Sequence, residues 1–127
     1  MTGRVVHFEI PFDDGDRARG FYQQAFGWNN TEMPEMSYTI AGTGPVSDQG
    51  MPTEPGYING GMFGRVPEFP QGPVITIDVP SIDDAMAKIV SLGGSAVGEK
   101  TTVGEMGFAA YFKDTEGNVM GLWENAG

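Results

Sequence analysis

Hydrophobic and polar residues alternate at the start of the chain, and a helical pattern follows. In residues 4–10, Val6, Phe8 and Ile10 lie on one side, which predicts a strand with one buried face. Pro11 is expected to end that strand. Apolar residues then recur at spacings of three and four over 13–26, which predicts an amphipathic helix ending at Gly27. The apolar positions of this helix are Ala18, Phe21, Tyr22, Ala25 and Phe26.

The same order of elements occurs again in the second half of the chain. Residues 74–79 predict a strand that ends at Pro80. Ser81 and Asp84 resemble a capping box with Asp in place of the usual Glu, and a second apolar stripe follows them. Gly93 is expected to end this helix.

Each predicted helix is followed by shorter strand-like stretches. These stretches are residues 37–40 and 58–63 in the first half, and 95–97, 108–112 and 118–123 in the second. Residues 114–118 predict a hairpin turn between the last two. The Gly/Pro-rich stretch 43–56 has no counterpart in the second half; it is interpreted as a disordered or plain surface loop, or alternatively as a functional lid. Two strand–helix–strands units predict an α+β fold, in which the units bury their bare sheet faces against each other or around a cavity.

Composition and charge narrow the function classes. The 127 residues are 39% hydrophobic and 19% charged, which is typical of one globular domain. The formal charge of -10 argues against nucleic acid and anionic membranes as partners, and also fits simple solubility. The absence of cysteine excludes disulfides and thiolate sites. Without an apparent signal peptide or an apolar run of ~20 residues, we expect a cytoplasmic protein.

Several short motifs resemble one known superfamily. The motifs are His7-Phe8-Glu9-Ile10-Pro11, Arg17-Ala18, Phe21-Tyr22, Phe26-Gly27-Trp28, Asn59-Gly60-Gly61-Met62, Ala109-Tyr111-Phe112-Asp114, Glu116-Gly117-Asn118 and Gly121-Leu122-Trp123-Glu124. They resemble the vicinal-oxygen-chelate proteins, which include glyoxalases, bleomycin-resistance proteins and extradiol dioxygenases. The resemblance implies a single domain, 1–127, of two βαβββ modules at about 1–66 and 72–125 with a linker at 67–71. It also implies one cup-shaped, eight-stranded mixed sheet with the helices outside.

The resemblance further implies where a metal would bind. The ligand positions on the first and last strands of the modules fall on His7, Thr76 and Glu124, and near Gly64. Because the chain has only one histidine, a centre of two histidines and one carboxylate from a single chain is excluded. A divalent metal (Zn, Mn, Ni or Fe) held by His7 and Glu124 would need one more carboxylate, and Glu9 or Asp78 would have to supply it.

Strand alternation supports part of this placing. If Val6, Phe8 and Ile10 face the helix, His7 points to the opposite face. On the last strand we expect Glu124 to point into the cup together with Met120 and Leu122. The alternative to a metal is a His7–Glu124 pair that lines the cavity, or that acts as acid and base.

The predicted function is the binding of a small organic molecule in the cup, around an incomplete metal site, and enzymatic activity is left undecided. The residues expected to bind the ligand are Tyr38, Met62, Thr76, Met120 and Leu122, with His7 and Glu124 as the catalytic pair. The alternatives are a glyoxalase-type or dioxygenase-like metal enzyme and a sequestering resistance protein. A homodimer is a further expectation of the resemblance.

Overall fold

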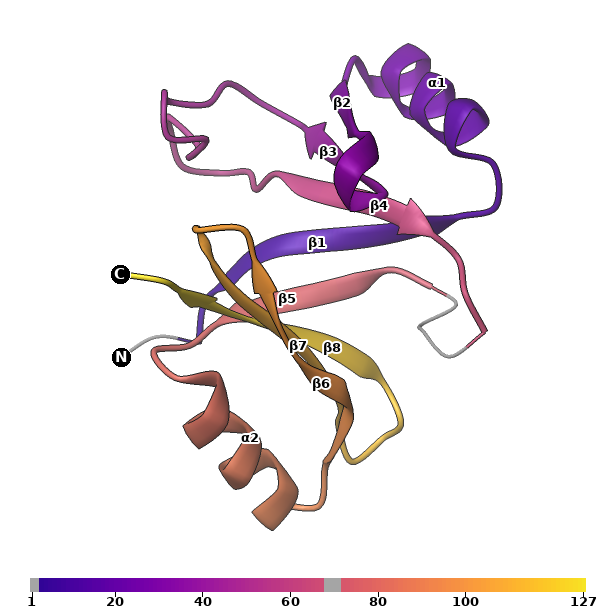
Figure 1. The fold of residues 1–127 in the computed structure, drawn as a ribbon. Coiled ribbons are helices and arrows are strands. Elements are labelled where there is room, and N and C mark those ends of the chain that lie inside the picture. The colour runs from indigo at the N-terminus through magenta and orange to yellow at the C-terminus, as the bar shows by residue number, and fades with distance from the viewer. Residues whose placement is uncertain (1–2, 68–71) are drawn as a thin grey trace. The chain divides into compact units, whose positions relative to one another are not determined.

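The computed structural model describes residues 3–67 and 72–127 of the chain. Within this part the elements follow the order β1 α1 β2 β3 β4 and then β5 α2 β6 β7 β8 (Figure 1). The βαβββ order therefore occurs twice, with parallel and antiparallel strand pairs in each copy. This confirms the α+β class and the two modules predicted from the sequence. Residues 68–71 of the expected linker lie outside the described residues, and the shared cup and the module bounds remain predictions.

The chain divides into two compact units. Unit 1 comprises Met1–Val6 and Val74–Gly127, and unit 2 comprises His7–Pro73. The first residues group with the second half because the Gly3 N–H donates to the Asp78 carbonyl at 2.8 Å, and the Asp78 N–H donates to the Arg4 carbonyl at 2.9 Å. The strand β1 thus begins in unit 1 and continues in unit 2.

Unit 2 contains one helix beside a mixed sheet with the strand order β2-β3-β4-β1. Its elements are β1 (Val5–Phe12), α1 (Gly15–Phe26), β2 (Asn29–Met33), a short 3₁₀ turn (Pro34–Met36), β3 (Tyr38–Gly42) and β4 (Gly60–Gly64). The strand β2 was not predicted from the sequence, because its residues are almost all polar. The strand lies at the edge of the sheet, where one side of the ladder needs no partner.

The end of β1 differs from the prediction. Pro11 does not end the strand, because it pairs with Phe63 of the parallel strand β4 and the pairing continues to Phe12. The Phe12 carbonyl then accepts a hydrogen bond from the Arg65 N–H at 2.8 Å. A proline removes only a donor from a ladder, so carbonyl groups on either side of it can still pair.

The helix α1 begins and ends as the sequence indicated. Asp14 caps it by accepting a hydrogen bond from the Arg17 N–H at 3.0 Å, and Gly27 ends it in a left-handed conformation with φ 77°. The predicted apolar stripe is only partly buried. Tyr22 stacks on Trp28 with ring centroids 4.7 Å apart, whereas Phe26 remains 66% exposed.

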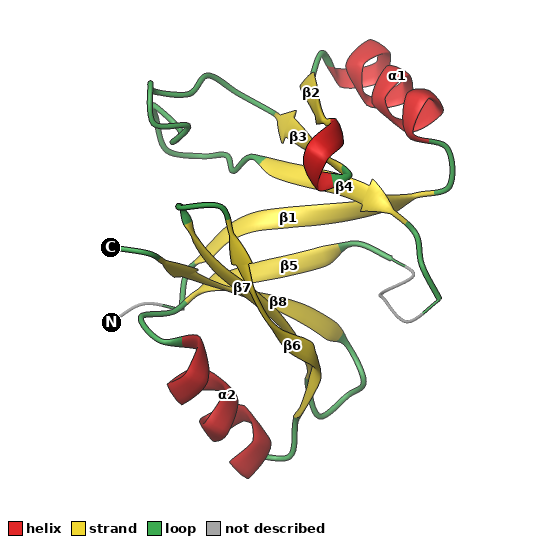
Figure 2. Ribbon diagram, viewed as in Figure 1, coloured by secondary structure: helices red, strands yellow, loops and turns green. Residues whose placement is uncertain are grey.

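Unit 1 contains one helix beside sheet strands in the order β5-β8-β7-β6, with both parallel and antiparallel pairs (Figure 2). Its elements are β5 (Val74–Asp78), α2 (Ile82–Ser91), β6 (Ser95–Val103), β7 (Gly107–Lys113) and β8 (Val119–Asn125). Its hydrophobic core lies between α2 and one face of this sheet, and consists of Ile82, Ala110, Phe112 and Leu122. The predicted cap of α2 is confirmed, because Ser81 Oγ accepts from the Asp84 N–H at 3.1 Å.

Candidate functional site

Three polar side chains of unit 2 form a hydrogen-bonded chain. His7 Nε2 lies 2.8 Å from the Tyr38 hydroxyl oxygen, and this hydroxyl donates to Glu9 Oε2, also at 2.8 Å. His7 and Glu9 come from β1, two residues apart, and therefore share a face of the sheet. Tyr38 comes from β3, which is separated from β1 by β4. We call His7, Tyr38 and Glu9 the polar triad.

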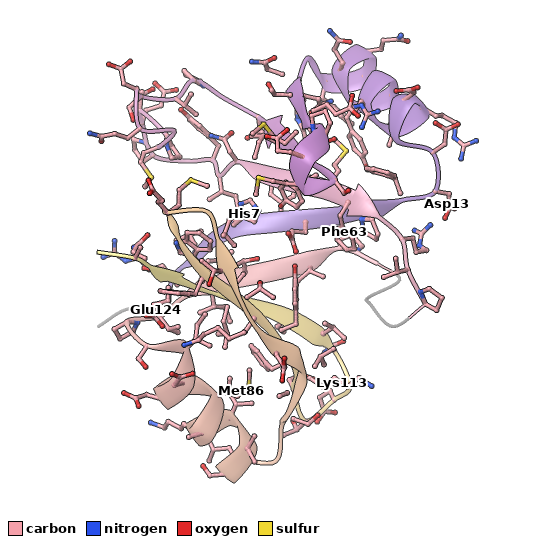
Figure 3. All side chains as sticks on the ribbon, in the orientation of Figure 1. His7, Asp13, Phe63, Met86, Lys113 and Glu124 are labelled. Carbon is pink, nitrogen blue, oxygen red and sulfur yellow. The ribbon has the colours of Figure 1, made fainter. Side chains whose placement is uncertain are left out.

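The polar triad lies on the sheet face that points away from α1. The neighbour of Tyr38 on β3, Thr39, accepts a hydrogen bond from Arg19 of α1 at 3.0 Å, so Thr39 faces the helix. Because side chains alternate along a strand, Tyr38 faces the other way. His7, which is labelled in Figure 3, therefore points away from α1, as strand alternation predicted.

Gly61 of β4 makes the contact between β3 and β1 possible. A Cβ atom added to Gly61 would overlap the Tyr38 hydroxyl and ring. Since Glu9 is the register partner of Gly61 on β1, the tyrosine side chain crosses β4 over the missing side chain and reaches the carboxylate. Gly61 is thus required for a close approach of side chains, and not for a turn.

Burial sets the electrostatics of the polar triad. Glu9 is only 8% exposed, and His7 is half-buried. Burial lowers the pKa of His7 below its usual value, and the negative charge of Glu9 opposes this shift without cancelling it. His7 is therefore neutral at pH 7, with one ring nitrogen protonated and the other able to accept a hydrogen bond.

Glu124 does not point where the sequence predicted. Its Oε1 accepts a hydrogen bond from the Ile82 N–H at 2.7 Å, so that its carboxylate caps the first turn of α2 (Figure 3). Met120, Leu122 and Glu124 do share a face, but this face meets the helix, because Leu122 lies in the core with Ile82. The catalytic and metal-binding roles expected for Glu124 stay predictions that this hydrogen bond does not support.

The structure separates the remaining predicted ligand-binding residues. Met62 is fully buried and is the register partner of Thr39, so it lies on the α1 side of its sheet and not beside the polar triad. Met120 packs against the core of unit 1. Thr76 is buried beside Gly121, on the sheet face opposite to that of Leu122. A ligand-binding role for these residues remains a prediction.

Asn59, which precedes β4, has a role that the sequence pattern did not predict. Its Oδ1 accepts hydrogen bonds from the Thr43 N–H at 2.7 Å and the Gly44 N–H at 3.3 Å. These two backbone donors orient the amide group and leave Nδ2 buried with no partner among the described residues. The sequence signal at this position is the run Asn59-Gly60-Gly61, part of one of the motifs that resemble the superfamily. The first residues of the stretch 43–56, which follows β3, are consequently fixed by hydrogen bonds to Asn59.

A metal ion does not fit the residues at the expected positions. Within residues 3–67 and 72–127, no group of three or more His, Cys, Asp or Glu side chains could hold a metal ion. His7 Nε2 is bonded to Tyr38, and the Glu124 carboxylate is bonded to a backbone N–H. The other two positions carry Thr76 and Gly64, a weak ligand and none. No chemical step is therefore assigned to a metal.

A groove of about 340 Å³ lies elsewhere in unit 2. The end of β1, the first turn of α1 and Arg65 line it, and Arg65 forms an ion pair with Asp13 at 2.7 Å. None of the polar triad lines this groove.

Sequence comparisons relate the chain to glyoxalase-like and bleomycin-resistance-like proteins. Residues 4–44 match the family model described as "Bleomycin resistance protein-like N-terminal". The whole chain is 29% identical over 131 residues to a "Glyoxylase-like domain-containing protein" of Didymella fabae, and covers 98% of it. These comparisons confirm the resemblance inferred from the sequence.

Solved structures share the fold at low sequence identity. A variant methylmalonyl-CoA epimerase of Streptomyces coelicolor, in complex with 2-nitronate-propionyl-CoA, matches with a TM-score of 0.66 and 17% identity, over 99% of this chain and 96% of that one. The epimerase of Mycobacterium tuberculosis matches with a TM-score of 0.61 and 17% identity, over 98% and 89%. At this identity the likeness shows the fold alone. In the described part of the chain, no helix is long and apolar enough to cross a membrane.

Proposed function

We propose that this protein binds a small organic molecule against the sheet face that carries the polar triad. The observation that carries the proposal is the hydrogen-bonded arrangement of His7, Tyr38 and Glu9 on the face away from α1. A few convergent polar groups among largely apolar side chains are the usual anatomy of small-molecule sites. The epimerase of Streptomyces coelicolor in complex with 2-nitronate-propionyl-CoA adds support, since a protein of similar fold binds a small organic molecule.

In this proposal His7 and Glu9 replace the His7–Glu124 pair as the polar anchors. Glu9 acts through Tyr38, from which it accepts a hydrogen bond. His7 uses one ring nitrogen for its hydrogen bond with Tyr38, and the other can bind the ligand. A metal-free triad of this kind can also move a proton, because a neutral imidazole is a general base at pH 7. Cytoplasmic location and a homodimer stay predictions from the sequence.

The test is an NMR screen of the full-length protein against a library of small fragments. We expect the best fragments to perturb the resonances of His7, Tyr38 and their strand neighbours, and to lose affinity in His7→Phe. Glu105→Gln serves as the control, because it removes an exposed carboxylate distant in sequence from the triad. Fragments that bind only the groove beside Arg65, with unchanged affinity in His7→Phe, would contradict the proposal.

A further inference from the structure

The direction of the hydrogen bonds in the polar triad fixes which nitrogen of His7 carries the proton. A carboxylate oxygen only accepts, so the single hydroxyl proton of Tyr38 is donated to Glu9. The hydroxyl oxygen can then only accept from His7 at 2.8 Å, which requires a proton on Nε2. In the neutral imidazole this leaves Nδ1 as a hydrogen-bond acceptor.

Nδ1 is the group of the triad that is left for a ligand. Within residues 3–67 and 72–127, the side-chain hydrogen bond of His7 is made by Nε2 and not by Nδ1. The charged group that faces His7 from within unit 2 is the Glu9 carboxylate, which adds negative potential at the imidazole. An acceptor with an anion behind it attracts hydrogen-bond donors and repels carboxylates and phosphates.

We propose that Tyr38 is a positioning residue that holds His7 as a hydrogen-bond acceptor, so that the site selects uncharged or cationic ligands bearing a hydroxyl, amide or ammonium donor. This inference rests on the proposed function and specifies the ligand chemistry of the same site. Glu9 orients the tyrosine hydroxyl, Tyr38 orients the imidazole, and the imidazole meets the ligand. Anionic ligands are disfavoured because they would meet a hydrogen-bond acceptor, His7 Nδ1, near the negatively charged Glu9 carboxylate.

The first test is spectroscopic and requires no ligand. His7 is the only histidine in the chain, so the ¹⁵N resonances of its ring are assigned without ambiguity. We expect the Nε2–H tautomer to dominate at pH 7.5 in the wild type. Tyr38→Phe removes the acceptor of the Nε2 proton and should shift the ring resonances toward a mixture of tautomers. Tyr57→Phe is the matched control, because Tyr57 donates to the Pro45 carbonyl in the loop and not to the triad.

The second test compares three probes of similar size: benzyl alcohol, benzylamine and benzoate. We expect the alcohol and the amine to bind the full-length protein about tenfold more tightly than benzoate, which corresponds to the net contribution of about one ordinary hydrogen bond. Tyr38→Phe should reduce this ratio to about threefold or less, and Tyr57→Phe should preserve it.

The outcomes separate this inference from the proposed function. A dominant Nδ1–H tautomer in the wild type, or benzoate binding at the triad as tightly as benzyl alcohol, would overturn the inference while leaving the binding site in place. A ratio that survives in Tyr38→Phe would show that Tyr38 has only a structural role. Failure of all three probes, together with an empty fragment screen, would overturn the proposed function as well.

Discussion

At the scale of single residues, the contact between Tyr38 and Gly61 decides whether the polar triad exists. Replacing Gly61 by Ala adds a methyl group where the tyrosine hydroxyl and ring now lie. We expect Gly61→Ala to cost about 1–3 kcal/mol of unfolding free energy, as other overpacking changes do, and to displace Tyr38 from His7. Urea denaturation and the ring resonances of His7 measure the two effects.

Gly64→Ala provides the control for this substitution on the same strand. A Cβ atom at Gly64 would meet Phe12 at 3.8 Å, which is ordinary van der Waals contact. It should therefore leave the triad intact. The double variant Gly61→Ala/Tyr38→Ala should recover part of the lost stability, because the overlap is gone. Equal destabilisation by both alanine variants would contradict the role given to the Tyr38–Gly61 contact.

A second prediction at this scale concerns pH. Since burial lowers the pKa of His7 in the folded state, the unfolded chain binds more protons as the pH falls below about 6.5, the ordinary value for histidine. His7 therefore contributes a loss of stability that begins near that pH and grows until the folded-state pKa is passed. His7→Gln keeps a donor for Tyr38 but does not titrate. We expect the wild type to lose more stability than His7→Gln between pH 7.5 and 5, measured by urea denaturation. Parallel pH profiles would show that His7 is not buried as described.

At the scale of elements, the N-terminus of α2 is held by two side chains from different parts of the chain. Ser81 accepts from the Asp84 N–H and Glu124 from the Ile82 N–H. We expect Glu124→Ala to destabilise the protein by about 0.5–2 kcal/mol, the range for helix caps, and Ser81→Ala to cost a similar amount. Calorimetry gives the melting temperatures, and Glu105→Ala is the exposed control. Unchanged stability with lost ligand binding would restore the site role predicted for Glu124.

Strand alternation predicted which residues share a face, but it did not always predict which face meets the helix. On β1 the alternation is informative, because aromatic Phe8 contrasts with polar His7 and Glu9. On β8 both faces carry large apolar residues, with Leu122 on one and Trp123 on the other, so the pattern leaves the choice open. The hydrogen bond between Tyr38 and Glu9 could not be predicted from the sequence. It depends on β4 lying between β3 and β1, and on the glycine at position 61 of β4.

At the scale of the whole molecule, the two βαβββ modules within residues 3–67 and 72–127 contain no group of three or more His, Cys, Asp or Glu side chains that could hold a metal ion. We therefore expect protein purified without chelator or affinity tag to carry far less than one transition metal ion per chain.

We also expect little or no glyoxalase turnover of the hemithioacetal of methylglyoxal and glutathione, because that isomerisation needs a metal-stabilised enediolate. Elemental analysis measures the metal content, and a spectrophotometric assay with added nickel or zinc measures the turnover. Stoichiometric zinc, or turnover that depends on added nickel, would contradict this expectation.

The clamp that Asn59 forms at the base of the long loop has a practical consequence. The Asn59 amide holds Thr43 and Gly44, which follow β3, to the start of β4. The ends of β3 and β4 are therefore held together without help from the rest of the loop that connects them. The tip of the loop closes its own turn, in which the Gly50 N–H donates to the Ser47 carbonyl at 2.9 Å. Doubling the length of such a loop costs only about 0.6 kcal/mol in chain entropy. The bond between Asp48 and Gln49 is therefore a suitable point at which to insert an epitope or a fluorescent reporter without disturbing the sheet.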